Sequence, residues 1–209
     1  KISKLVSNNS TLVGCRIPGN KLAKKLITLF NLPIAAPSAN LSERTSVTNI
    51  MDIDPILVKK IFVLKDKQSS HGLESTVVRI DTNNEIEVLR YGSITVEELN
   101  KYAKVKIKKK SSISPGNLKK HYSTLKPIRM NAKRIFKNEG LLNFGNNKLK
   151  SKIINLNLSN KKNLNEAAKN FYHYLHKLDQ SRCKKIAVVE IPDKGLGKTI
   201  NDRLRRAIK

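Results

Sequence analysis

The chain has 209 residues and carries 42 Lys and Arg against 16 Asp and Glu, a formal net charge of +26. This charge favours partners that carry phosphate, such as nucleotides, pyrophosphate and RNA. No apolar run approaches the length of a membrane span, and Cys15 and Cys183 form no CxxC pair, so a membrane protein and a disulfide scaffold are excluded. We therefore expect a cytoplasmic protein with free thiols, large enough for one large or two small domains. Since the lysines are spread along the chain and mixed with Asn, we interpret the charge mainly as a compositional habit of the source genome.

The first 64 residues are expected to alternate between strands and helices. Short apolar runs predict strands at 11–16, around Leu32 and Ile34, and at 61–64. Between the first two runs, apolar residues at helical spacing predict a helix that Asn20 caps. Residues 48–60 have a helical pattern in which Pro55 must kink the helix or start a new one.

The next segment has the pattern of a hairpin. Residues 75–80 alternate and are β-branched, and the turn at 81–84 leads into a partner strand. Thr95 and Glu98 have the spacing of a capping box, and residues 105–110 form an edge strand that lysines protect.

Residues 111–128 lack any periodicity and contain two prolines and a glycine, which predicts an ordered linker between two lobes. Beyond it the pattern runs strand (152–158), helix (162–179), strand (184–191) and final helix (199–208). This order is typical of a small α/β lobe with a parallel sheet.

Small and hydroxyl-bearing residues dominate the stretch 33–46, PIAAPSANLSERTS. Alanines let a ligand approach the backbone, and Ser38, Asn40, Ser42, Arg44 and Ser46 offer donors in close succession. A strand followed by such a loop suits an anion pocket at the end of a sheet. An ordinary polar loop remains the alternative on chemistry alone.

Six segments in this order resemble the YrdC-like threonylcarbamoyl-AMP synthases, in the long form with an extra C-terminal domain. They are VGCRIPGN (13–20), PIAAPSANLSER (33–44), GLESTVVRI (72–80), LRYGSIT (89–95), SPGNLKKHYS (114–123) and GLGKTINDRLRR (195–206). The resemblance implies an α/β protein: a YrdC-like lobe with a twisted, largely mixed or parallel sheet, incomplete here, and a small Rossmann-like C-terminal domain. The implied domains are residues 1–110 and 129–209, joined by the linker 111–128.

The resemblance also implies residues for two substrate sites. Those that line the threonine site are Arg16, Ala36 and Ser75. Those that contact ATP are Ser38, Asn40, Ser46, Arg90, His121 and Tyr122. Ser75 is equally compatible with an ordinary strand serine. The linker departs from the family's usual Met-Lys-Tyr pattern, and Lys65-Asp66-Lys67 replaces a family Asp-Gly-Gly, which implies a reshaped loop.

The implied activity is nucleotidyl transfer, in which threonine, bicarbonate and ATP yield threonylcarbamoyl-AMP and pyrophosphate for tRNA modification. ATP is a substrate, Mg²⁺ bridges the phosphates, no side chain acts as acid or base, and the partners are downstream tRNA-modification enzymes. The family's Lys-x-Arg phosphate motif has no equivalent in residues 1–15, so we expect an incomplete copy with weak activity of its own. The alternatives are a non-catalytic RNA-binding protein, with direct tRNA contact, and a regulatory module of the same pathway.

Two further motifs resemble a phosphate-binding loop and a metal site, but neither has the residues that such a site requires. Residues 195–199, GLGKT, imitate the end of a P-loop, but the first glycine of that motif is replaced by Pro192. His173 and His176 lie three residues apart on a helix without a Cys or acidic partner at suitable spacing, so we expect two surface histidines and no metal site.

Overall fold

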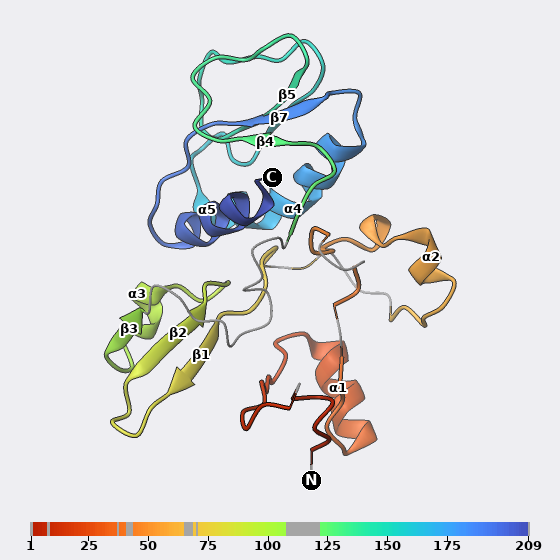
Figure 1. Ribbon diagram of the computed structural model, residues 1–209, viewed down its shortest axis with the longest axis vertical. Coiled ribbons are helices and arrows are strands. Elements are labelled where there is room, and N and C mark those ends of the chain that lie inside the picture. The colour runs from red at the N-terminus through yellow and green to blue at the C-terminus, as the bar shows by residue number, and fades with distance from the viewer. Residues whose placement is uncertain are drawn as a thin grey trace. The chain divides into compact units, whose positions relative to one another are not determined.

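The structure is a computed structural model that describes residues 2–7, 9–36, 38–40, 44–64, 69, 71–107 and 122–208 (Figure 1). The chain divides into two compact units, Lys1–Ser38 and Ala39–Lys209, and each is described by itself. No helix among the described residues combines the length and the apolar character needed to cross a membrane.

The first unit is built around one helix, α1 (Lys21–Phe30). The Asn20 side chain accepts a hydrogen bond from the Ala23 N–H, and Asn31 ends the helix in a left-handed conformation (φ 54°), as the sequence predicts. None of the described residues of this unit is buried. The predicted strand at 11–16 and the one around Leu32 and Ile34 do not form, since neither segment has a ladder partner among the described residues.

The second unit begins with short elements that surround a three-stranded sheet. A 3-10 turn, η1 (Ile50–Asp52), and α2 (Pro55–Val58) confirm that Pro55 starts a new helix, whereas the predicted strand at 61–64 is absent. The hairpin of β1 (Val77–Ile80) and β2 (Ile86–Arg90) is antiparallel, and β3 (Val105–Ile107) pairs with β2 in parallel.

Between β2 and β3 lies α3 (Val96–Leu99), which starts with the predicted capping box of Thr95 and Glu98. The sheet is therefore mixed, as predicted. The predicted edge strand is confirmed for residues 105–107, and its remainder lies outside the described residues, as does most of the predicted linker.

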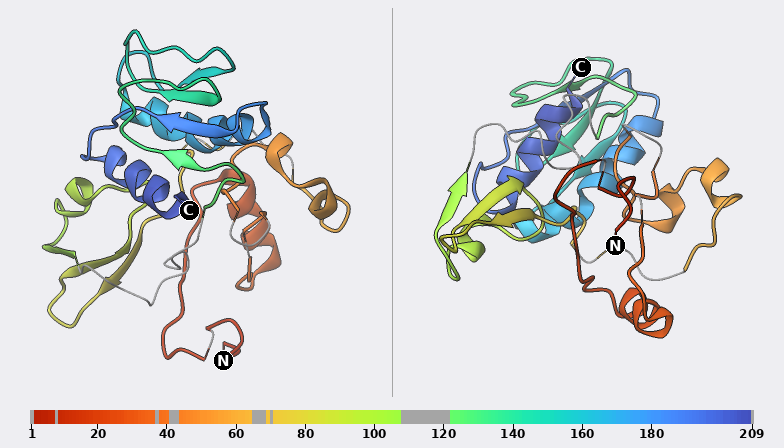
Figure 2. Two further views of the ribbon diagram at one scale, coloured as in Figure 1. Left: turned by 45° about the horizontal axis from the view of Figure 1, so that its top comes forward. Right: turned by 60° about the horizontal axis from the view of Figure 1, so that its bottom comes forward.

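The C-terminal part of the second unit contains an all-parallel sheet in the order β4-β7-β5-β6. Its strands are β4 (Ile128–Arg129), β5 (Glu139–Asn143), β6 (Asn155–Asn157) and β7 (Lys185–Val188). Figures 1 and 2 show α4 (Leu164–Gln180) and α5 (Leu196–Ala207) side by side along one face of this sheet. The predicted α/β class, with a small parallel C-terminal sheet, is confirmed.

The core of this part is aliphatic with few aromatics. Buried apolar residues of α4 follow the helical spacing and pack against Leu142, Ile186 and Val188 of the sheet. No element is predicted from the sequence for residues 139–143, which form β5, a central strand buried along its whole length. Leu73, which precedes β1, belongs to the same buried cluster as α4, so the segment that leads into β1 is anchored in this core.

Candidate functional site

The backbone of residues 74–76 is held against the segment that follows β2. The Ser93 N–H donates to the Glu74 carbonyl at 2.8 Å, and the Thr76 hydroxyl donates to the Ile94 carbonyl at 2.6 Å. A Cβ at Gly92 would lie 2.2 Å from the Thr76 nitrogen, so only glycine permits this approach of two backbones.

The same segment also packs directly on α4. Gly72 has a φ of +65°, and a Cβ there would lie 2.2 Å from the Ala168 carbonyl oxygen and 2.4 Å from the Lys169 Cα. Leu73 follows and is only 8% exposed. Residue 74 is thereby placed between the first sheet and the helices of the second.

The Glu74 carboxylate accepts hydrogen bonds from three distant parts of the chain. Its Oε1 accepts from the Tyr172 hydroxyl at 2.6 Å and from the Ser46 hydroxyl, and its Oε2 accepts from the Arg203 Nε at 2.9 Å. Tyr172 lies on α4 and Arg203 on α5. One carboxylate therefore joins the segment around residue 46 to both helices.

Arg203 is fully buried, and its guanidinium is held on every side. Besides the bond to Glu74, Nη1 donates to Asp202 at 2.5 Å and Nη2 donates to the Tyr91 carbonyl at 2.5 Å. Its Cζ lies 4.6 Å from the centroid of the Tyr122 ring, a cation–π contact. We refer to Ser46, Glu74, Tyr122, Tyr172 and Arg203 as the Glu74 cluster.

In the Glu74 cluster, the Glu74 carboxylate and the Arg203 guanidinium stabilise each other in their charged forms. Burial acts to raise the pKa of Glu74, but the positive charge of Arg203 and the hydrogen bonds from Ser46, Tyr172 and Arg203 outweigh it, and the pKa is lowered overall. Burial and the nearby Glu74 charge both raise the pKa of the Tyr172 hydroxyl, which therefore stays a neutral donor. Burial also raises the pKa of Tyr122, and Glu74 adds to the effect.

Four of the nine residues predicted to contact substrates meet at this cluster. Ser46 and Tyr122 belong to it, and the Arg90 Nη2 donates to the carbonyl of Ser75 at 2.9 Å, next to Glu74. Tyr122 is 2% exposed and has a φ of +65°, a conformation that costs a non-glycine residue energy and is concentrated at functional sites.

The other five predicted residues are Arg16, Ala36, Ser38, Asn40 and His121. Arg16, Ala36 and Ser38 belong to the first compact unit. The Asn40 side chain donates to the Arg44 carbonyl at 3.1 Å. His121 lies outside the described residues.

The two histidines of α4 are half-buried, which corrects the expectation of surface residues. The His176 Nε2 lies 3.1 Å from the Thr45 hydroxyl and 3.3 Å from the Ser46 carbonyl, and the His173 Nδ1 lies 3.1 Å from the Asp52 carboxylate. Both histidines thus hold the segment 45–52 along α4. Among the described residues, no group of three His, Cys, Asp or Glu side chains could hold a metal ion.

Sequence reasoning missed Glu74, Tyr172 and Arg203 as functional candidates. A signal was present for Arg203, because it shares a helical stripe with the buried Ile200, Leu204 and Ala207. A charge inside an apolar stripe requires a buried partner. No pattern in the sequence identifies Glu74 as that partner.

The GLGKT motif forms the beginning of a helix and not a phosphate loop. α5 starts at Leu196, and a Cβ at Gly197 would lie 2.0 Å from the Pro192 carbonyl oxygen. Thr199 is buried and donates to the Gly92 carbonyl at 3.0 Å. The hydroxyl that a P-loop would present to a metal is used here to fasten α5 to the segment after β2.

Comparisons with known proteins agree with this two-part α/β arrangement. A family model described as "Threonylcarbamoyl-AMP synthase, C-terminal domain" matches residues 94–208, and one described as "Telomere recombination" matches residues 1–92. The fold is that of an α/β protein with one mixed and one parallel sheet, of the kind to which these models belong. The chain belongs to the threonylcarbamoyl-AMP synthase family.

Individual relatives carry the same name. The chain is 25% identical to the threonylcarbamoyl-AMP synthase of Pyrococcus abyssi over 99% of its length and 66% of that protein. It is 32% identical to the Schizosaccharomyces pombe synthase (58% of this chain, 33% of that protein) and 33% identical to the Bacillus subtilis synthase (61% and 39%). The chain thus spans 66% or less of the length of these relatives.

Among solved structures, the chain resembles P. abyssi Sua5 crystallised with L-threonine. The TM-score is 0.84 at 24% identity, with 99% of this chain and 66% of that chain covered. A variant of the same protein gives a TM-score of 0.73. This likeness shows the fold.

Proposed function

We propose that this chain acts in the synthesis of threonylcarbamoyl-AMP and pyrophosphate from threonine, bicarbonate and ATP. Support comes from the membership of the family and from the meeting of Ser46, Ser75, Arg90 and Tyr122 at the Glu74 cluster. The contact between Arg90 and Ser75 carries the proposal, because it joins a residue assigned to ATP with one assigned to threonine. The P. abyssi structure is named as a complex with L-threonine, which agrees with threonine as one substrate.

The roles of the residues follow from their chemistry. Arg16, Ala36 and Ser75 hold threonine, and the planar guanidinium of Arg16 suits a bidentate contact with its carboxylate. Ser38, Asn40, Ser46, Arg90, His121 and Tyr122 hold ATP. The amine of threonine captures bicarbonate as a carbamate with loss of water, and a carbamate oxygen attacks the α-phosphorus while pyrophosphate leaves. Arg90 neutralises charge that develops on the phosphate oxygens.

Catalysis in this proposal depends on positioning. The Ser46 hydroxyl and the Arg90 guanidinium are fixed by bonds to Glu74 and to the Ser75 carbonyl, so little orientational freedom is lost when substrate binds. Mg²⁺ would be held mainly by the phosphates, since Glu74 already accepts from three donors and the nearby Asp202 is paired with Arg203 and Arg206.

We place the reaction in the cytoplasm, where the product would pass to an enzyme that modifies the adenosine beside the anticodon of tRNA. The net charge of +26 would attract the phosphate backbone of tRNA, so direct contact with tRNA is an additional part of the proposal. An RNA-binding function without catalysis predicts an RNA affinity that falls steeply with salt and does not respond to threonine.

Joint binding of the two substrates tests the proposal. Threonine and ATP together should raise the melting temperature by more than the sum of their separate effects, and pyrophosphate should form only when bicarbonate is present. Arg90→Gln should abolish the joint effect, whereas Arg79→Gln, at the neighbouring β1 strand, should preserve it because Arg79 pairs with Glu87. Separate, additive shifts by the two ligands, or equal effects of both variants, would overturn the proposal.

A further inference from the structure

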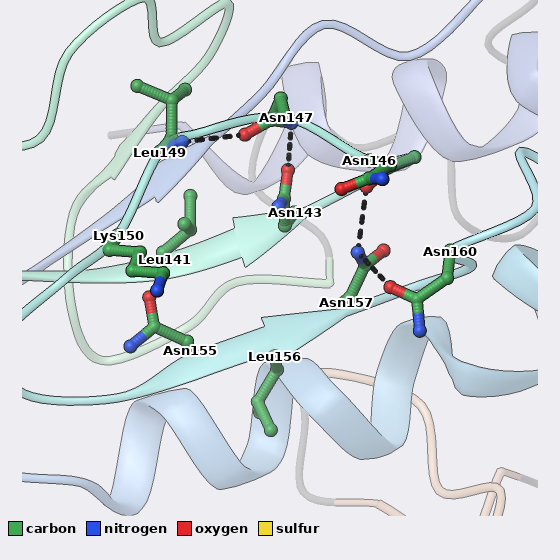
Figure 3. A pocket seen from close by; sticks show the side chains of 11 residues that line it. Leu141, Asn143, Asn146, Asn147, Leu149, Lys150, Asn155, Leu156, Asn157 and Asn160 are labelled. Carbon is green, nitrogen blue, oxygen red and sulfur yellow. Dashed lines mark hydrogen bonds between the residues drawn. The ribbon is translucent and has the colours of Figure 1, made fainter.

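A second site lies in the C-terminal part of the chain, far along the sequence from the predicted substrate residues. A pocket of about 460 Å³ is lined by residues of β5, of β6 and of the loop that follows β5 (Figure 3). A Cβ at Gly140 would contact Leu178 of α4, so Leu141 and Asn143, whose side chains alternate with it, lie on the opposite face of the sheet. Asn143 and Asn157, the last residues of two parallel strands, pair in register. The carboxyl ends of parallel strands are where open α/β sheets bind ligands.

Asparagine dominates the lining, and backbone N–H groups fix which way four of these amides point. The Asn143 Oδ1 accepts from the Phe144 N–H at 2.9 Å, and the Asn147 Oδ1 accepts from the Leu149 N–H at 3.0 Å. Only an oxygen can accept such a bond, so the amide nitrogens of these side chains are assigned without ambiguity.

The same logic fixes the amides contributed by β6. The Asn155 Oδ1 accepts from the Ser151 N–H at 2.7 Å, and the Asn157 Oδ1 accepts from the Ser159 N–H at 3.1 Å. The Asn157 Nδ2 donates to the Gly145 carbonyl at 2.8 Å and to the Asn160 Oδ1 at 2.6 Å. This bond also orients the Asn160 amide, whose oxygen faces Asn157 and whose nitrogen points away from Asn157.

These bonds leave a surplus of donors around the pocket. The Asn143 Oδ1 accepts a second bond from Asn147, while no acceptor for the Asn143 Nδ2 is found among the described residues, although the residue is only 9% exposed. The amide nitrogen of Asn143 thus keeps N–H groups without an acceptor in the described part of the chain, whereas its oxygen is occupied. Lys150 adds a positive charge, and no Asp or Glu is found among the described lining residues.

The pocket therefore offers hydrogen-bond donors and one cation, together with apolar surface from Leu141 and Leu149. Figure 3 shows Asn143 and Asn147 facing each other beside Asn146 and Asn157, while Leu156 points toward the helix below the sheet. A donor-rich, acid-free lining suits an anion with many acceptor oxygens. The volume is in the range of small-molecule sites, about 300–1,000 Å³, and exceeds what a phosphate ion needs.

We propose that this pocket binds a small phosphorylated molecule of mononucleotide size, with its phosphate near Asn143 and Lys150. The site is separate from the proposed substrate site and does not depend on it. A nucleotide and free phosphate share this chemistry, and the experiment distinguishes them.

Backbone amide signals in two-dimensional NMR spectra report where each probe binds. AMP and inorganic phosphate should shift the signals of residues 143–150 and 155–160, AMP at a concentration at least tenfold lower, and adenosine should leave them unchanged. Shifts confined to residues 74–94 would instead report the proposed substrate site, so the two proposals can fail independently.

Variants test the donor surplus directly. Asn143→Asp keeps the oxygen that accepts from Phe144 but replaces the donor with a charged acceptor, so the affinity for AMP should fall at least tenfold. Lys150→Gln should weaken binding several-fold, whereas Lys152→Gln, which makes the same change of charge outside the lining, should have no effect. Melting temperatures show whether the variants fold. If Asn143→Asp does not fold, Lys150→Glu is tested in its place. Equal losses for Lys150→Gln and Lys152→Gln would indicate general attraction to a basic chain and overturn the proposal, as would binding that Asn143→Asp leaves unchanged.

Discussion

Removal of the Arg203 guanidinium tests whether the Glu74 cluster holds the second unit together. Arg203→Met keeps the length and apolar stem of the side chain but deletes its bonds to Glu74 and to the Tyr91 carbonyl and its contact with the Tyr122 ring. The loss of one partner from a buried ion pair costs about 3–5 kcal/mol, because the other charge stays buried. The neutral bond to Tyr91 and the cation–π contact are each worth about 1 kcal/mol and lie within that figure.

The measurement is the free energy of unfolding from urea titration, followed by circular dichroism at pH 7. Arg205→Met is the matched control, because Arg205 lies on the same helix and pairs with Asp193 at a site where both side chains are 56% exposed. Such a surface pair contributes about 0–1 kcal/mol. We expect a loss of at least about 3 kcal/mol for Arg203→Met and less than about 1 kcal/mol for the control.

The dependence on pH separates a charge effect from a packing effect. Without Arg203, burial dominates and raises the pKa of Glu74, so protonation at pH 5 relieves the buried charge and the cost of the substitution shrinks. Glu74→Gln removes the charge at every pH, and the double variant should lose less than the sum of the two single losses by at least about 2 kcal/mol. A loss of the same size at pH 5 and pH 7, together with additive single losses, would refute the reasoning.

Three further outcomes are expected. The pKa of Glu139 is lowered, chiefly by the hydrogen bond that it accepts from Arg129. The ionised Glu139 therefore stabilises the fold fully above its ordinary pKa of 4.5, and this stabilisation is lost as the pH falls through the lower pKa of the folded state. In an acid titration, the stability of Arg129→Met should decline less steeply below pH 4.5 than that of the unchanged chain. Gly72→Ala should destabilise the chain by about 2 kcal/mol or more in urea titration, because the new Cβ meets the Ala168 carbonyl oxygen at a positive φ, whereas Gly14→Ala has open space and should be neutral. In hydrogen exchange, α1 amides should exchange much faster than α4 amides, since α1 buries no residue and α4 buries six; equal protection would contradict this.

Local sequence signals predicted the elements whose cause is local. Asn20 and Asn31 bound α1, Thr95 caps α3, and Pro55 starts α2, each through bonds or steric limits within a few residues. The alternating β-branched run and its turn likewise predicted the β1–β2 hairpin. These features could be predicted because no distant part of the chain is needed to produce them.

Elements that depend on distant partners were predicted less well. The runs at 11–16 and 61–64 have strand-like composition but no ladder partner among the described residues, and β5 was missed because a short, doubly buried run carries no periodicity. The candidate site shows the same division. Ser46, Arg90 and Tyr122 were identified through motifs, whereas Glu74 gains its importance from Ser46, Tyr172 and Arg203, which lie 28, 98 and 129 residues away in the sequence.

The Glu74 cluster also explains why the domain limits expected from sequence differ from the compact units. Ser46 and Glu74 lie in the segment matched by one family model, and Tyr172 and Arg203 lie in the segment matched by the other. The compact unit Ala39–Lys209 spans both segments. Because Arg203 is fully buried and each of its neighbours is a fixed acceptor or ring, the two segments cannot separate without exposing a charge pair and breaking its bonds. The bond between Arg203 and Glu74 thus fastens α5 to the segment that contains Ser75, so the C-terminal part is a structural support for the proposed substrate site.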